Sequence, residues 1–200
     1  MREILPGVFH WSVYYDKIKV EVSSYYLAGP KVLLDPLLPV AGASGLEAGV
    51  DHIILTNRHH YRDSAALVER YGCTVWCVES GLHEFTSGET VRPFKAGDTL
   101  PGDIQTMAIG AICPDETALV LNQPAGVVAL ADGVIRRGDG PLEFVPDKYM
   151  GENPEDVKAG LKESYTRFLG QYDFDHMLLA HGEPWIGGAS QALREFLDKS

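Results

Sequence analysis

The chain has 200 residues, 45% of them hydrophobic, and a formal net charge of −11 at pH 7. This length and apolar content suffice to bury one core, so we expect a single domain over residues 1–200. The acidic balance argues against nucleic acid and against an anionic membrane surface as partners, because both require clustered Lys and Arg.

Neither a secretory leader nor a membrane span is expected. Residues 1–7 lack the long apolar core of a signal peptide, and no apolar stretch is long enough to cross a bilayer. Cys73, Cys77 and Cys113 form an odd, sparse set, which is typical of a reducing compartment. We therefore expect a cytoplasmic protein, and we interpret Cys73 and Cys77 as small buried apolar residues.

The first quarter of the chain predicts β-strands joined by tight turns. Its strands are rich in β-branched and aromatic side chains, and Asp16-Lys17 lies at a hairpin turn. Residues 42–49 are small and predict a flexible loop with one short helical turn. The predicted strands cover residues 8–15, 19–27, 31–34 and 51–56.

Helical spacing of apolar residues begins at 64–71, and Gly72 is the expected C-cap. A second helix begins at Asn153-Pro154-Glu155-Asp156, with Pro near the first helical position and acids in the first turn, and runs to about residue 169. A closing helix is expected over 189–198. The remaining predicted strands cover residues 74–78, 103–109, 117–121, 127–130 and 175–180.

The predicted elements alternate along the chain between groups of strands and helical units, twice in succession. This order suggests two β-sheets faced by helices. Four polar segments each adjoin an apolar strand, and loops at strand ends gather at one edge of a layered α/β protein. Histidines and carboxylates that converge on rigid strand ends are what a divalent metal requires. The four segments are residues 57–63, 113–116, 132 and 181–185.

In this order the four segments resemble the ligand motifs of the metallo-β-lactamase superfamily. Thr56-Asn57-Arg58-His59-His60-Tyr61-Arg62 stands where that family has Thr-His-x-His-x-Asp-His. Pro114-Asp115-Glu116, Ala131-Asp132 and Ala180-His181-Gly182 stand where it has Pro-Gly-His, Gly-Asp and Gly-His-Gly. The resemblance covers essentially the whole chain, and it implies a four-layer αβ/βα sandwich of two mixed β-sheets flanked by helices.

The resemblance implies that one metal position keeps a workable set of ligands. Asn57 stands at the first His, His59 matches the second, and Glu116 stands at the third. Together with Asp132, these residues suit zinc, iron or manganese, with Asn57 as a weak neutral oxygen donor. A small change of register would make His60 the ligand in place of His59, and that alternative stays open.

The resemblance implies that the other metal position is damaged. Tyr61 and Arg62 replace its Asp and adjacent His, beside Asp132 and His181. Arginine stays protonated and cannot ligate a metal, but it carries a fixed positive charge. Arg62 could replace the second cation, by pairing with Asp132 or by holding a substrate carboxylate or phosphate. We expect one divalent ion or none.

Three functions are compatible with these residues. The first is a hydrolase of a small ester, thioester, lactone or phosphoester, in which a metal-activated water attacks, Asp132 orients the nucleophile, and Arg62 or His181 stabilises the oxyanion. The second is a catalytically inactive binding protein of the same fold that has lost its metals. The third is an iron redox protein, since a Glu in place of a His favours iron.

A structural role is an open alternative for each of the candidate residues. Glu116 could be a strand-end carboxylate, Asp132 a turn cap and His181 a satisfied structural histidine. The expected partner is a small-molecule substrate, and whether the chain forms a homodimer is left open.

Overall fold

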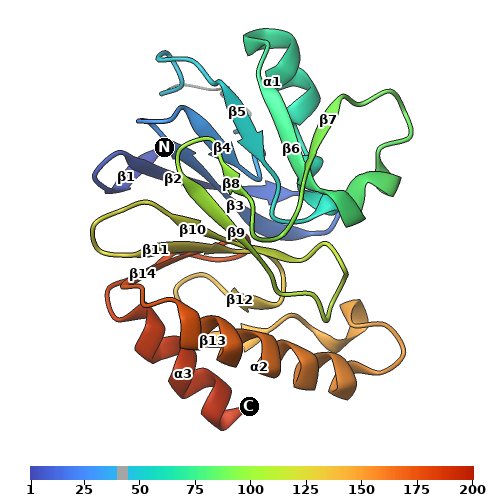
Figure 1. Ribbon diagram of the computed structural model, residues 1–200, viewed down its shortest axis with the longest axis vertical. Coiled ribbons are helices and arrows are strands. Elements are labelled where there is room, and N and C mark those ends of the chain that lie inside the picture. Colours follow the sequence, from blue (N-terminus) through green and yellow to red (C-terminus); the bar gives the residue numbers. More distant parts are fainter. Residues whose placement is uncertain (40–44) are drawn as a thin grey trace.

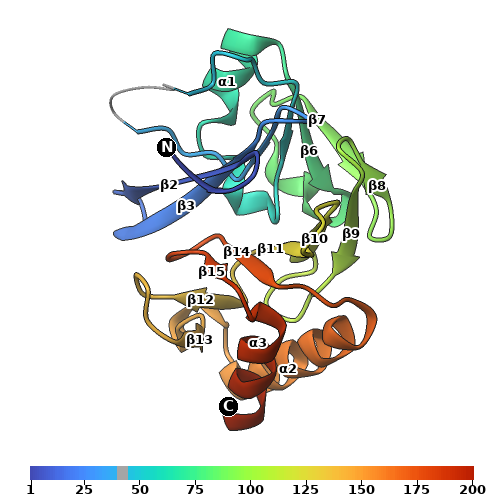
Figure 2. The ribbon, with the colours of Figure 1, turned by 90° about the vertical axis from the view of Figure 1, so that its left-hand side faces the viewer.

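The computed structural model describes residues 1–39 and 45–200. Two β-sheets stack face to face, with α1 on the outer face of the first sheet and α2 and α3 on the outer face of the second (Figures 1 and 2). The predicted αβ/βα sandwich is therefore confirmed. Of the predicted loop 42–49, residues 42–44 lie outside the described residues, and residues 45–49 include turns.

Within the described residues, the first sheet has seven strands in the order β1-β2-β3-β4-β5-β6-β7. Neighbouring strands are antiparallel from β1 to β4 and parallel from β4 to β7. Helix α1 (Ser64–Tyr71) connects β5 to β6 and ends at Gly72, whose φ of 66° is the left-handed cap that the sequence predicts. The strands are β1 (Arg2–Leu5), β2 (Val8–Tyr15), β3 (Val20–Leu27), β4 (Val32–Leu34), β5 (His52–Ile54), β6 (Thr74–Val78) and β7 (Val91–Phe94).

The second sheet has the order β15-β14-β11-β10-β9-β8 in the same part of the chain, and β12 and β13 form a separate pair. Among the strand pairs that the structure describes in this sheet, only β11 and β14 are parallel, and α2 (Pro154–Gln171) lies between them in the chain, as a parallel connection requires. Helix α3 (Ala189–Lys199) packs beside α2. The strands are β8 (Thr99–Leu100), β9 (Ile104–Ala108), β10 (Thr117–Leu121), β11 (Val127–Leu130), β12 (Val134–Arg136), β13 (Leu142–Phe144), β14 (His176–Leu179) and β15 (Trp185–Ile186).

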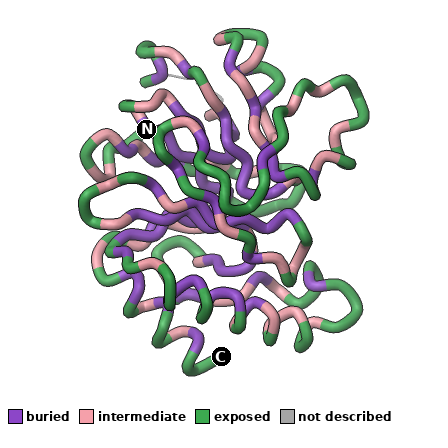
Figure 3. Tube along the Cα trace, in the orientation of Figure 1, coloured by how far each residue is buried: buried purple, intermediate pink, exposed green. Residues whose placement is uncertain are grey.

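The core is divided among three apolar layers, and the buried residues follow the strands of both sheets (Figure 3). The middle layer lies between the sheets and contains Tyr25, Leu119 and Leu178. One outer layer lies under α1 and includes Cys73 and Cys77, which are buried as expected. The other outer layer lies under α2 and α3. No helix of the described chain has the length and apolar character needed to cross a membrane.

One edge of this sandwich collects the polar segments that the sequence singled out. Asp35 directly follows β4, Asp132 comes two residues after β11, and His181 comes two residues after β14. After β5, Asn57 lies at the N-cap of the short 3-10 helix η1 (Arg58–Tyr61). Glu116 directly precedes β10, whose antiparallel pairing with β11 brings its start to the same edge. The fold therefore brings the candidate site residues to one place.

Candidate metal centre

The loop after β5 is held by two side chains, and they decide which histidine turns inward. The Asn57 side chain caps η1, because its Oδ1 accepts the N–H of His59 at 3.0 Å. Asp115 is fully buried, accepts the Arg58 N–H at 2.7 Å and forms an ion pair with the Arg58 guanidinium. In the resulting tight turn His60 is buried and His59 is exposed.

Two histidine side chains converge on one carboxylate oxygen of Asp132. The Nε2 atoms of His60 and His181 each lie 3.1 Å from Oδ1 of Asp132. The three potential ligand atoms lie within 4.8 Å of one another. His60 is 4% exposed, whereas the side chains of His181 and Asp132 are 16% and 20% exposed, so the cluster opens to solvent on the side of these two residues.

A second carboxylate lies behind His60. Asp35 is 3% exposed, and its Oδ2 lies 3.0 Å from His60 Nδ1. Thr56 fixes this carboxylate, because its N–H donates to Oδ1 at 2.8 Å and its hydroxyl donates to Oδ2 at 2.6 Å. The motif comparison missed Asp35. The available signal was its position directly after an apolar strand, which resembles the position of Asp132.

Charge rather than burial determines the protonation of this cluster. Burial by itself lowers the pKa of His60, but the carboxylates of Asp35 and Asp132 outweigh it and raise that pKa to about 9. Burial by itself raises the pKa of Asp132, but His60 and His181 outweigh it and hold that pKa well below its usual range. The pKa of Asp35 is likewise lowered, because His60 outweighs the effect of burial.

The other oxygen of Asp132 faces different chemistry. The Asn57 amide donates to Oδ2 at 2.9 Å. Glu116 is fully buried, and its Oε1 accepts the N–H of Gly133 at 2.7 Å. Burial, followed by repulsion from Asp132, raises the pKa of Glu116 to about 8, so this carboxyl is protonated at neutral pH.

The structure therefore groups the ligands differently from the motif comparison. His59 is exposed, Glu116 does not join the group of convergent ligand atoms, and Oδ1 of Asn57 accepts the N–H of His59. Glu116 accepts the backbone N–H of Gly133, the residue after Asp132. Asn57 donates to Oδ2 of Asp132 itself. The position expected to be workable is thus a hydrogen-bonded support. His60 instead joins Asp132 and His181, the two residues that the resemblance leaves at the damaged position.

Arg62 and Tyr61 lie on opposite sides of the loop. Arg62 has a backbone φ of 41°, which is strained for a residue other than glycine. Its Nη1 donates to the backbone carbonyls of Asp35 at 2.6 Å and Ser23 at 3.1 Å. Its guanidinium therefore brings a fixed positive charge close to the cluster. Tyr61 packs on the ring of Phe85, 5.5 Å between centroids, in the layer under α1 and away from the cluster.

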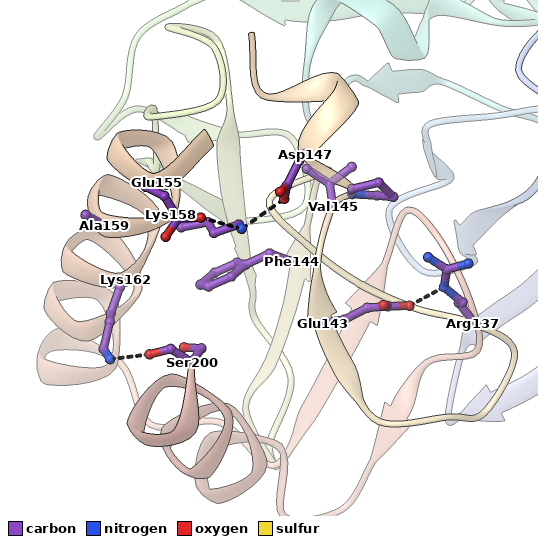
Figure 4. Close-up of a pocket in the computed structure, with 11 residues that line it drawn as sticks. Arg137, Glu143, Phe144, Val145, Asp147, Glu155, Lys158, Ala159, Lys162 and Ser200 are labelled. Carbon is purple, nitrogen blue, oxygen red and sulfur yellow. Dashed lines mark hydrogen bonds and ion pairs between the residues drawn. The ribbon is translucent and has the colours of Figure 1, made fainter. Parts of the chain in front are cut away.

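A hollow of about 630 Å³ lies elsewhere, between β13, the 3-10 helix η3 (Asp147–Tyr149) and α2 (Figure 4). Each of its cations already has a partner within the hollow, and that of Lys162 is the Ser200 backbone oxygen at 2.8 Å. Lys158 contacts Asp147 at 2.9 Å and Glu155 at 2.8 Å, and Arg137 contacts Glu143 at 2.6 Å. None of the cluster residues lines this hollow, so we do not assign the site to it.

Neither a protein-family model nor a curated protein matches this sequence. Solved structures do match. A metallo-β-lactamase from Pontibacter korlensis is 14% identical, with a TM-score of 0.71 over 100% of this chain and 98% of that one. A metallo-β-lactamase family protein from Thermus thermophilus is 19% identical, with a TM-score of 0.70 over 98% and 80%. TTHA1623 in a di-iron-bound form is 20% identical, with a TM-score of 0.59 over 88% and 87%.

These similarities extend over nearly the whole chain at low sequence identity. Likeness at this level establishes the arrangement of the strands and helices, whereas chemistry depends on the residues of the site. The departures at Asn57, Tyr61, Arg62 and Glu116 make the motif a divergent one. This chain has the metallo-β-lactamase fold.

Proposed function

We propose that the protein is a metal-dependent hydrolase that holds one divalent ion between His60, Asp132 and His181. The observation that carries the proposal is the convergence of two imidazole nitrogens on one carboxylate oxygen, each at 3.1 Å. Ligand atoms about 2.0–2.1 Å from zinc at tetrahedral angles lie roughly 3.3 Å apart, so this spacing suits an ion. Asp35 behind His60 matches the carboxylate that fixes the ring of a metal-bound histidine.

The donor set permits zinc and also iron, and a structural neighbour is described in a di-iron-bound form. When bound, a divalent ion supplies Lewis-acid activation of water and of a carbonyl or phosphoryl oxygen. Substrates of this kind are small esters, thioesters, lactones or phosphoesters. The three cysteines are free, which supports placing this reaction in the cytoplasm.

The chain's own residues prepare the site for that chemistry. Asp35 takes the Nδ1 side of His60 and leaves Nε2 facing Asp132. Asn57 holds Oδ2 of Asp132, so that only Oδ1 is presented to the two histidines. Arg62, held by two backbone carbonyls, places a positive charge where it stabilises the negative charge that develops on the substrate.

A metal-free binding protein is the second candidate, and one observation favours it. Successive side chains in the line Asp35–His60–Asp132–His181 lie 3.0 to 3.1 Å apart, so contacts among these side chains can hold the cluster together. A pKa of about 9 keeps His60 protonated at neutral pH in the metal-free state, and an ion has to displace that proton. The two candidates therefore differ in whether metal displaces this proton under cellular conditions.

Metal content decides between them. We expect protein purified without added metal to contain about one ion per chain. His60→Gln and His181→Gln should each abolish it, whereas His59→Gln, a change of the same type at the exposed neighbouring residue, should retain it. Equal metal content in the His59 and His60 variants would refute the site. Substoichiometric metal in the wild type, with a melting temperature unchanged by chelator, would favour the binding protein.

A further inference from the structure

Strand β3 runs past the end of its neighbour β4, and its free edge faces the His181 loop. β3 pairs with β2 along its whole length but with β4 only at Tyr25, Tyr26 and Leu27. The chain leaves the sheet after β4 at Asp35, which has a φ of 48°. Buried backbone donors and acceptors of β3 on this side therefore require partners outside the sheet.

Ser23 makes three separate contacts across this free edge, and it is fully buried. Its N–H donates to the Ala180 carbonyl at 2.9 Å, and its hydroxyl donates to the Gly182 carbonyl at 2.7 Å. Its own carbonyl accepts Nη1 of Arg62 at 3.1 Å. Ser23 thus holds the residues on both sides of His181 and also the guanidinium of Arg62.

A hydrogen bond from His10 orients the Ser23 hydroxyl. Nε2 of His10, a residue only 3% exposed, lies 3.0 Å from Ser23 Oγ. Because the single hydroxyl proton goes to Gly182, the His10 nitrogen is the donor in this pair. The chain of donation runs from His10 through Ser23 to Gly182.

Two further residues of β3 contact this segment, Tyr25 at Leu179 and Glu21 at His181 itself. The Tyr25 hydroxyl donates to the Leu179 carbonyl at 2.8 Å and accepts the Leu179 N–H at 3.0 Å. The Glu21 carbonyl lies 3.3 Å from His181 Nδ1. Residues 21, 23 and 25 alternate along the strand, so all three act on the same side of it. With Nδ1 directed at β3, Nε2 of His181 is directed at Asp132.

The loop has little freedom to compensate for a lost contact. Gly182 has a φ of 88°, and a Cβ atom there would lie 2.3 Å from the Arg136 carbonyl oxygen. We propose that Ser23, oriented by His10, is a positioning residue that sets His181 against Asp132 for ligand binding. The inference rests on the proposed function, because it assigns His181 to the metal site.

Ser23→Ala tests the inference, with Ser190→Ala as its matched control. The Ser190 side chain is also buried and donates to a backbone carbonyl, that of Phe174 at 2.6 Å, but it lies at the opposite end of β14. We expect both variants to melt at lower temperature. Only Ser23→Ala should weaken binding of Zn²⁺, by about 10-fold or more in competition with a chromophoric chelator. It should also change the visible spectrum of the Co²⁺-loaded protein.

Equal Zn²⁺ affinities and equal Co²⁺ spectra in the two variants would overturn the positioning role and leave the proposed function standing. Ser23→Thr, which keeps the hydroxyl, should restore much of the lost affinity. If Ser23→Ala does not fold, His10→Phe replaces it, because it keeps a ring and removes the donor behind Ser23. A smaller loss of affinity is then expected, and no loss would count against the role.

If the wild type binds neither ion, the proposed function fails, and the inference is decided on the metal-free protein. The imidazole nitrogen resonances of His181 report its contacts with Glu21 and Asp132. They should shift in Ser23→Ala and stay in place in Ser190→Ala. Identical His181 resonances in both variants would refute the positioning role.

Discussion

The two oxygens of Asp132 face opposite kinds of chemistry. Oδ1 faces the ring nitrogens of His60 and His181, both at 3.1 Å. Oδ2 faces the amide of Asn57, while the protonated Glu116 holds the neighbouring backbone. A histidine can release its proton and offer a lone pair to an ion, but an amide N–H cannot. One side of Asp132 can therefore accept a cation, and the other side can only support the carboxylate.

This difference separates the residues that could hold an ion from the residues that orient Asp132. Asn57 and Glu116 occupy positions of ligands in the motif, yet each now makes a hydrogen bond that fixes Asp132 or the residue after it. We call Asn57 and Glu116 the support side of Asp132, and His60 and His181 the ligand side. The support side keeps the carboxylate oriented toward the ligand side. The variants below change first both sides of Asp132 together and then each side separately.

The largest effect is expected from Asp132→Asn, which damages both sides at once. It removes the charge that pairs with His60 and His181 and leaves a buried cation with Asp35 alone. Breaking such a pair should lower the free energy of unfolding by about 4 kcal/mol and abolish metal binding. Denaturant unfolding at pH 7 in chelator measures the first effect. A loss below about 1 kcal/mol would show that Asp132 is not charged and paired as described.

The ligand side should make the metal-free protein sensitive to alkali. The pKa of His60 is raised to about 9, so its proton stabilises the folded state fully below its unfolded pKa near 6.5, and this stabilisation is lost as the pH rises through 9. We expect a loss of up to about 3 kcal/mol over that window. Unfolding free energies in chelator from pH 6 to 9.5 measure it. His60→Gln should flatten this part of the profile, and an unchanged slope would contradict the assignment.

The support side should respond in a lower pH window. The folded state keeps the proton of Glu116 up to about pH 8, whereas the unfolded chain releases it near pH 4.5. Stability should therefore fall as the pH rises from 4.5 to 8, and Glu116→Gln should remove that fall. Relative to wild type, the variant should gain about 3 kcal/mol between pH 5 and 8. A variant that loses stability over this range would show that Glu116 is ionised in the fold.

Much of the fold could be predicted because its signals are local. The bounds of β2, α1, β6, β10 and β11 agree with the sequence patterns, and Gly72 caps α1 as predicted. Short elements were missed or misjudged, since two or three residues carry no measurable periodicity. The strand predicted over 51–56 is only His52–Ile54, because the chain turns to present Thr56 to Asp35.

The sequence motifs singled out Asp132 and His181, but which side chains contact them depends on residues that are distant in sequence. Counting along the motif cannot distinguish His59 from His60, because the turn is set by Asp115 through Arg58 and by the cap from Asn57. Asp35 enters the site because β4 and β5 pair in parallel, with Leu34 opposite Ile54. No pattern within either segment reports that pairing.

The smallest effect, and the sharpest test of the difference between the two sides, is expected from Asn57→Asp. An aspartate still caps η1 through the N–H of His59, so only the amide that donates to Asp132 Oδ2 is replaced by an oxygen. Two carboxylates then face each other, which should lower the free energy of unfolding at pH 7 by about 1 kcal/mol in chelator. Added Zn²⁺ should reverse this loss, because a cation can now lie on both sides of Asp132. An equal loss of unfolding free energy with and without Zn²⁺ would mean that Asn57→Asp does not create a cation site on this side of Asp132.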